Sequence, residues 1–144
     1  MRFLINKTDG IGGMVSIGNC PNPEDFEEAI RKWKLSWPGR YISHREILPS
    51  EVPTDRTFRD ALVDTGAKIA CDIPRAREIL KDSLRVDRVL KLAALDTAYM
   101  RADEMGDAAE KQRISALKQV LRDVTKNPAI EAARTTEALK LLLP

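Results

Sequence analysis

A long stretch without proline or glycine, residues 75–105, constrains this chain more than any other feature of the sequence. It is rich in arginine, leucine, alanine, glutamate and lysine, which are strong helix formers, and it lacks the two residues that most often interrupt a helix. Proline precedes it at Pro74 and glycine follows it at Gly106. The sequence therefore predicts one long helix that begins just after Asp72 and ends at Gly106.

A second helix is expected directly after this turn. Asp107 is a good N-cap and Glu110 follows three positions later, as in a capping box, while Asn127 and Pro128 end the helix near Lys126. Apolar or small residues recur at spacings of three and four in both helices: Leu95, Ala98, Ala102 and Met105, then Ile114, Leu117, Leu121 and Val124. Because such seams pack against each other, we expect an antiparallel helical hairpin followed by short helices at 128–133 and 135–143.

The first 72 residues are expected to form a small domain of strands and one helix. Residues 2–6 and 14–17 flank an Asp-Gly turn in a segment with three glycines, at 10, 12 and 13, which predicts a β-hairpin rather than a phosphate-binding loop. Asn22 and Pro23 are typical of a helix start. The apolar face of that helix is expected to comprise Phe26, Ala29, Ile30 and Trp33, with short strands following at 41–48 and 68–73 and one or two helical turns at 56–63. The predicted class is α+β, with an N-terminal domain of residues 1–72 and a helical domain of residues 73–144.

Composition excludes several classes of protein. The chain of 144 residues is 43% hydrophobic and 32% charged, enough for one core. Its apolar runs, such as 141–143, fall far short of the ~18 residues of a membrane span. Residues 1–6 do not resemble a secretory leader, so export by that route is not expected. The 24 basic and 22 acidic residues nearly balance, which gives no overall field for nucleic acid or anionic lipid.

Residues capable of catalysis are few. The single histidine, His44, excludes a site of several histidine ligands, and the two cysteines, Cys20 and Cys71, have no metal-site or disulfide spacing. A nucleophilic arrangement of Cys71, His44 and Asp72 would require that the fold bring them together, so a small cysteine-dependent enzyme remains a weaker alternative. We expect no cofactor and no metal.

One face of the long helix carries the strongest nucleic-acid signal in the chain. Four cations follow one another at intervals of four, four and three: Arg77, Lys81, Arg85 and Arg88. Acidic neighbours at Glu78, Asp82 and Asp87 favour an ordinary charged helix face. Phosphate binding by this face stays open as an alternative, either to nucleic acid or in a role that modulates host defence.

Five blocks of sequence together resemble a family of small proteins encoded by tailed bacteriophages and prophages. These blocks are SHREI at 43–47, DRTFRDA at 55–61, DIPRAREI at 72–79, LDTAYMRA at 95–102 and KQVLRDVT at 118–125. The resemblance runs from about residue 42 to 144, and the C-terminal part is also similar to the ends of phage tail and tail-fibre assembly proteins. It implies a non-enzymatic morphogenesis or virion protein, found in the host cytoplasm during assembly or in the particle, and it supplies no catalytic residues.

The apolar side chains of the long helix identify a candidate contact surface. A second helix that starts at Gly106 and ends near Lys126 is too short to cover the beginning of the first. Five apolar residues there need another cover: Ile79, Leu80, Leu84, Val86 and Val89. The N-terminal domain and the segments after Pro128, through Leu139 and Leu142, can supply part of it. Any remaining apolar surface predicts self-association or a complex with a phage structural, tail or fibre protein.

Overall fold

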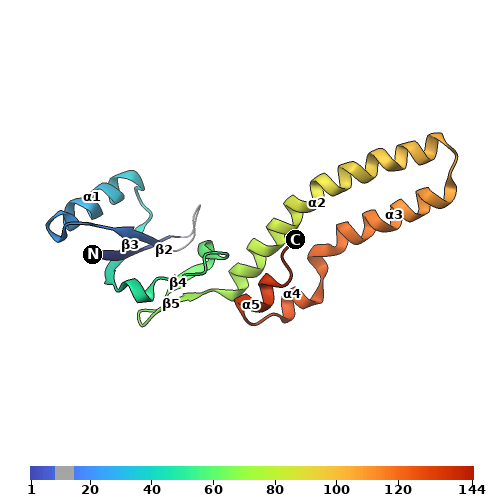
Figure 1. The fold of residues 1–144 in the computed structure, drawn as a ribbon. Coiled ribbons are helices and arrows are strands. Elements are labelled where there is room, and N and C mark those ends of the chain that lie inside the picture. The colour runs from blue at the N-terminus through green and yellow to red at the C-terminus, as the bar shows by residue number, and fades with distance from the viewer. Residues whose placement is uncertain (9–14) are drawn as a thin grey trace. The chain divides into compact units, whose positions relative to one another are not determined.

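In a computed structural model, which describes residues 1–8 and 15–144, the chain divides into two compact units, Met1–Ala76 and Arg77–Pro144. The predicted α+β class is confirmed (Figure 1). The division falls within the first turn of the long helix, just after the expected boundary at Asp72. The glycine-rich turn predicted at 10–13 lies outside the described residues.

The first unit is built on a three-stranded antiparallel sheet with the order β2-β1-β3. Its strands are β1 (Arg2–Lys7), β2 (Val15–Asn19) and β3 (Tyr41–Ile47). The predicted pairing of the first two strands is confirmed, with Leu4 opposite Ile17 and Phe3 opposite Gly18. Gly18 is required there because a Cβ atom at this position would lie 2.2 Å from Cζ of the Phe3 ring.

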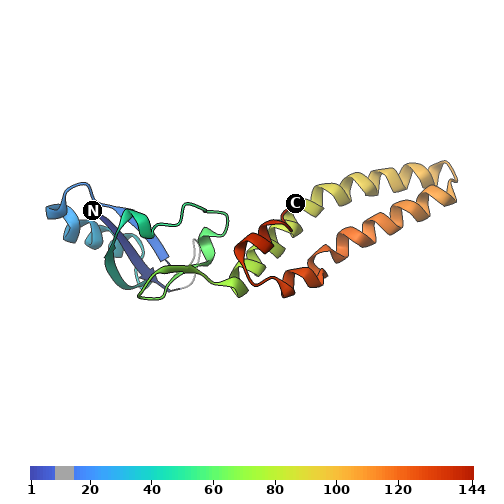
Figure 2. The same ribbon diagram turned by 60° about the horizontal axis from the view of Figure 1, so that its bottom comes forward.

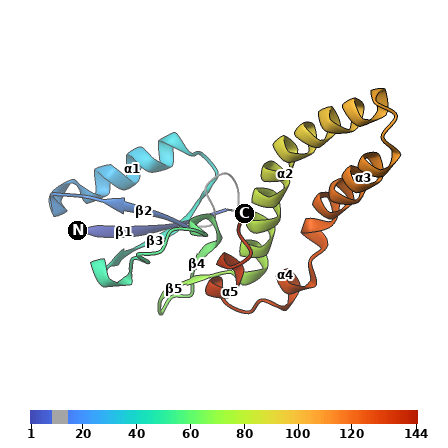
Figure 3. The same cartoon turned by 45° about the vertical axis from the view of Figure 1, so that its right-hand side comes forward.

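The central strand β1 is covered on both faces. On one face lies α1 (Phe26–Ser36), and Phe3, Ile5, Cys20 and Ile30 form a cluster beneath it. On the other face Leu4 packs with Val15, Ile47 and Leu62. Leu62 comes from the two-stranded sheet of β4 (Leu62–Asp64) and β5 (Ile69–Cys71), and Figure 3 shows α1 and this sheet on opposite sides of the three strands.

Short helical turns complete the first unit, and two expectations about them are corrected. Only the 3-10 turn η3 (Arg59–Ala61) is helical within the predicted segment 56–63, because the chain continues directly into β4. Asn22 does not cap a helix with its side-chain oxygen; its amide group donates to Asp25 at 3.0 Å, and the 3-10 turn η1 (Pro23–Asp25) leads into α1. A third turn, η2 (Pro49–Glu51), follows β3.

An ion-pair junction connects the three-stranded sheet to the two-stranded one. Arg45 on β3 donates to both carboxylate oxygens of Asp64 on β4, at 3.1 and 3.3 Å, and to Glu51 at 2.8 Å. The Asp64 side chain is 5% exposed and also accepts from Asn6 and from the backbone of Gly66. Hydrogen bonds from Arg45 above all hold the pKa of Asp64 below its ordinary value.

The second unit is the predicted helical hairpin. Its long arms are α2 (Ile73–Glu104) and α3 (Ala108–Asp123), which run side by side (Figure 2). Gly106, with φ of +69°, adopts the left-handed conformation that ends α2, and the Asp107 side chain accepts from the backbone amide of Glu110 as predicted. After η4 (Val124–Lys126), the short helices α4 (Pro128–Ala132) and α5 (Thr136–Lys140) lie beside the N-terminal part of α2 in Figures 1 to 3.

Candidate functional site

The Cys71, His44 and Asp72 arrangement considered from the sequence is not assembled in this fold. His44 accepts or donates a hydrogen bond of 2.8 Å with the Tyr41 hydroxyl, and its ring packs edge-on against Phe26 on the α1 side of the sheet. Cys71 packs against the cluster of Leu4 on the other face. The sheet therefore separates the imidazole from the thiol that it would have to activate.

The four cations of the predicted phosphate-binding face are all engaged within the chain. Arg77 donates to the backbone oxygen of Ala133 at 2.8 Å, and both Arg77 and Lys81 pair with Glu131 of α4. Their side chains are only 14% and 18% exposed. Arg85 pairs with Asp82, and Arg88 donates to the backbone oxygen of Arg122. This face holds α4 against α2, and little of its charge is left for a phosphate backbone.

Ion pairs at two positions along the hairpin connect its two arms. Near the turn Lys111 pairs with Asp103, and further along Lys118 pairs with Asp96 at 2.5 Å. Both ammonium groups lie over the ring of Tyr99, at 5.7 and 5.3 Å from its centroid.

The predicted apolar seam of the hairpin is only partly confirmed. Ala102 and Ile114 are buried at 5% and 1% exposure, whereas Met105 and Leu117 are 81% and 40% exposed. The spacing pattern correctly predicts burial of Ala102 in the last turn of α2 and of Ile114 in α3. It is wrong at Leu117, and at Met105, which lies beyond the end of α2 so that helical spacing no longer places its side chain.

The five apolar residues proposed to bind a partner fall into two groups. Leu80 and Leu84 are buried at 0% and 6% exposure and Ile79 is half-buried, so these three are covered within the chain. Leu139 of α5, which was expected to supply part of this cover, is itself fully buried. Val86 and Val89 remain 73% and 61% exposed, so they alone of the five are available to a partner.

A mostly apolar row of residues extends along α2 from Val86, and we call it the outer row. It follows a spacing of four, three, four and three residues, which is the spacing of a coiled-coil seam. Its members are Val86, Leu90, Ala93, Thr97 and Met100. All five are exposed, with Val86 at 73%, Leu90 at 79% and Met100 at 63%. Of these five residues only Val86 was expected from the sequence to contact a partner, although the spacing of the row is visible in the sequence.

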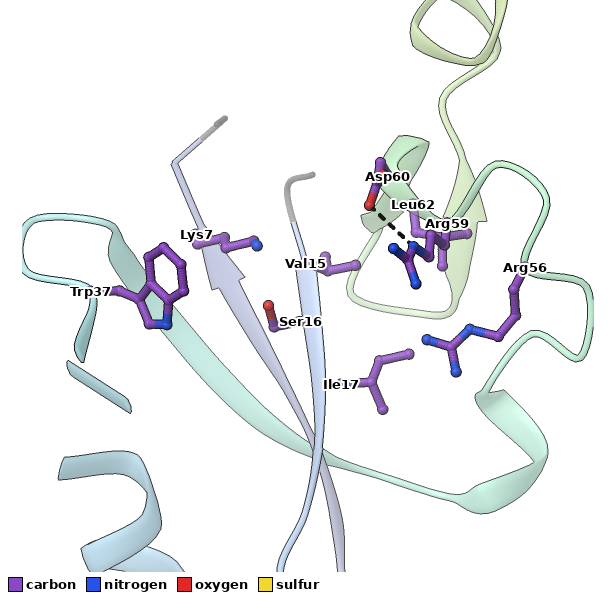
Figure 4. Close-up of a pocket in the computed structure, with 9 residues that line it drawn as sticks. All are labelled: Lys7, Val15, Ser16, Ile17, Trp37, Arg56, Arg59, Asp60 and Leu62. Carbon is purple, nitrogen blue, oxygen red and sulfur yellow. Dashed lines mark ion pairs between the residues drawn. The ribbon is translucent and has the colours of Figure 1, made fainter. Parts of the chain in front are cut away.

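A pocket of about 380 Å³ in the first unit brings polar side chains from several elements together. Figure 4 shows Lys7 on β1 and Ser16 on β2 with Trp37 to one side, and Arg56 and Arg59 on the other side. Val15, Ile17, Asp60 and Leu62 complete the lining. Trp37 is 45% exposed there, whereas Trp33 packs into the cluster under α1.

Lys7 is the unusual residue of this pocket because it is charged and only 6% exposed. Burial lowers the pKa of Lys7, the nearby Arg40 and Arg75 lower it further, and Asp60 acts in the opposite direction. Nothing in the sequence pattern of β1 distinguished Lys7 from the end of an ordinary strand.

No family model, curated protein or solved structure matches this chain in comparisons of its sequence and fold. Within residues 1–8 and 15–144, no three acidic, histidine or cysteine side chains are grouped so that they could hold a metal ion. None of the described helices combines the length and the apolar character needed to cross a membrane.

Proposed function

We propose that this chain is a non-enzymatic morphogenesis or virion protein of tailed bacteriophages that acts through protein–protein contacts. The observation that carries the contact role is the outer row of α2, which is apolar and exposed over about 20 Å of helix. The phage assignment rests on the resemblance of the five sequence blocks, three of which lie wholly or partly in α2 and α3.

The form of the outer row favours a helix as its partner. Scattered exposed apolar residues are normal on a protein surface, but a row at coiled-coil spacing is the surface that fits the side chains of a second helix. Ser83 and Glu104 lie where the row would continue at its two ends. The apolar surface is therefore limited in length and bounded by polar residues, as in a defined contact.

Charges beside the outer row favour a second copy of this chain in antiparallel orientation. Asp87, Ala94 and Arg101 follow one another at intervals of seven along the same flank. A two-fold axis near Ala94 would place Asp87 of each copy close to Arg101 of the other, with small alanines between them. The Arg101 side chain makes no hydrogen bond or ion pair with any described residue, so it is available for this contact.

On the opposite flank, the acidic residues do not prevent this pairing. Asp96 lies close to the two-fold axis and would approach its counterpart in the second copy, but it is already paired with Lys118 of α3. The lysine within each hairpin thus neutralises the carboxylate charge that would otherwise repel the second copy. A phage tail, connector or fibre protein that presents a similar helix is the alternative occupant of the row.

Sedimentation equilibrium of the purified full chain tests this proposal. We expect a dimer, and Leu90→Asp is expected to weaken dimerisation by at least about tenfold because it places a charge in the centre of the seam. The matched control is Val120→Asp on α3, where the valine is similarly exposed at 68% but lies outside the row. Circular dichroism checks that both variants keep their helix content.

A wild-type chain that remains a monomer at all concentrations contradicts dimerisation through the outer row. So does an equal loss of dimer in the Leu90 and Val120 variants, because the contact would then not be specific to the row.

A further inference from the structure

We propose that the free edge of β2 is a docking site for an extended acidic segment of a partner protein, which would add to the three-stranded sheet as a further strand. The site lies within the first unit and is independent of the outer row of α2.

The hydrogen bonds at the start of the sheet show which main-chain groups of β2 face this edge. The Met1 amino group donates to the Cys20 oxygen and the Cys20 amide donates to the Met1 oxygen, both at 2.9 Å. Such bonded pairs alternate along an antiparallel ladder, and the register continues without a shift, so Gly18 also bonds to β1. Ile17 and Asn19 therefore direct their N–H and C=O groups away from β1.

These outward groups have no partner among the described residues. The sheet has the order β2-β1-β3, so β1 is the one strand of the described chain that pairs with β2. Neither Ile17 nor Asn19 makes a hydrogen bond with another described residue outside that ladder. An unpaired row of donors and acceptors is the surface to which an extended peptide adds as a strand.

The opposite edge of the sheet, β3, is protected against such pairing, whereas β2 is not. The register of β3 shifts near the end of β1, and its sequence includes Arg45 and Glu46. Bulges, charges and prolines are features that prevent a further strand from pairing at a sheet edge. The β2 sequence, VSIGN at 15–19, contains no charged residue and no proline. The edge of β2 is therefore the open one.

The pocket beside β2 provides space for the side chains of an added strand. It has a volume of about 380 Å³ and is lined by Val15 and Ile17 of β2 and by Arg56 and Leu62 on the other side. Figure 4 shows the Ile17 side chain and the Arg56 guanidinium directed toward each other. Side chains on one face of an added strand would enter this pocket.

Charge around the pocket favours an acidic segment. Arg56 is exposed, and its side chain makes no hydrogen bond or ion pair with a described residue. Arg59 pairs at 3.7 Å with Asp60, the one carboxylate that lines the pocket. Lys7 also lines the pocket, but it has an interaction of its own and carries no part of this argument. An acidic strand would meet an unpaired guanidinium, whereas the uncharged β2 of a second copy would not.

Nuclear magnetic resonance titration of the full chain tests the site with three capped hexapeptides. The first alternates glutamate and valine, the second has the same sequence with every amide N-methylated, and the third has lysine in place of glutamate. We expect the first to bind with a Kd of about 1 mM or tighter and to shift the amide signals of Ile17 and Asn19. The second is expected to bind at least about tenfold more weakly because it lacks main-chain donors, and the third because its charge repels Arg56.

Variants assign this binding to the edge of β2. Asn19→Pro removes an N–H that faces away from β1, so the sheet keeps its hydrogen bonds while binding of the first peptide is expected to weaken at least about fivefold. Arg56→Gln leaves the main chain unchanged and is expected to weaken binding by about tenfold. The matched control is Arg134→Gln, an exposed arginine of the second unit.

Four results would overturn the proposal. The first is the absence of a saturable shift, and the second is equal binding of the N-methylated peptide. The third is equal binding by the Arg56→Gln and Arg134→Gln variants, because acidic side chains would then not be recognised at the pocket. The fourth is an Ile17 amide signal that shifts with protein concentration alone in the Leu90→Asp variant, because the edge would then belong to a second copy.

Discussion

At the scale of single residues, Arg45 shows how one side chain can join two sheets. It is 27% exposed and bonded to Asp64 and Glu51, whereas the Arg31–Glu28 pair on α1 joins two exposed partners three positions apart. A buried carboxylate that loses its only cation remains desolvated, so breaking such a pair costs far more than breaking a surface pair.

Replacing Arg45 with methionine is expected to lower the free energy of unfolding by about 2–3 kcal/mol at neutral pH. The matched control is Arg31→Met, which removes an ion pair with Glu28 whose side chains are 62% and 46% exposed. We expect that control to cost less than about 0.5 kcal/mol. Urea unfolding followed by circular dichroism measures both, and equal effects of the two substitutions would contradict the role given to Arg45.

The same junction predicts a dependence of stability on pH. The folded-state pKa of Asp64 is lowered by Arg45, and that of Glu51 is lowered by the Leu48 amide and then by Arg45. Carboxylates with lowered pKa values stabilise the fold above their unfolded values, about 3.9 and 4.3, and this contribution is lost as the pH falls through the folded values. The difference between wild type and Arg45→Met should therefore be largest near pH 6 and shrink below about pH 4.

The sequence did not reveal this junction, because its members are far apart in the chain and only the fold brings them together. The same is true of the pocket, whose cations come from β1, from η3 and from the segment that precedes η3. Residue pairs close in sequence were easier to predict. The cap formed by Asp107 is an example, since its partner Glu110 is three positions away.

At the scale of elements, α2 was predicted almost to its ends because its composition and its terminating glycine agree. The residue types did not show which charged face of α2 has a function. By spacing alone, Arg77 and Lys81 are typical of a phosphate-binding face. Both side chains nevertheless pair with Glu131, which is far from them in the sequence and adjacent to them in the fold.

Arg77→Ala is expected to destabilise the second unit by about 1–2 kcal/mol, because it removes the hydrogen bond to Ala133 and the ion pair with Glu131. Arg85→Ala is the control, since Arg85 is 46% exposed and pairs only with Asp82, a residue of the same helix. Thermal unfolding measures the difference. Equal stability of the two variants, together with loss of DNA binding at ~150 mM salt in both, would favour the nucleic-acid alternative instead.

At the scale of the whole molecule, the two units carry different candidate roles. The first unit, Met1–Ala76, holds the cationic pocket, and the second, Arg77–Pro144, presents the outer row. Local sequence patterns were enough to predict the α+β class and the helical hairpin. They could not predict which apolar residues the chain covers by itself, because Leu80 and Val86 are equally apolar and only the tertiary fold buries one and exposes the other.

Methionine oxidation tests the central claim, burial of the outer row in a contact, most directly. Met100 lies in the row and Met105 lies beyond it, and both are well exposed in the single chain, at 63% and 81%. We predict that dilute hydrogen peroxide oxidises Met105 quickly and Met100 several-fold more slowly in the concentrated wild-type protein, as measured by peptide mass spectrometry. Dilution or the Leu90→Asp substitution should remove that protection. Equal oxidation of the two methionines at high protein concentration would contradict the account.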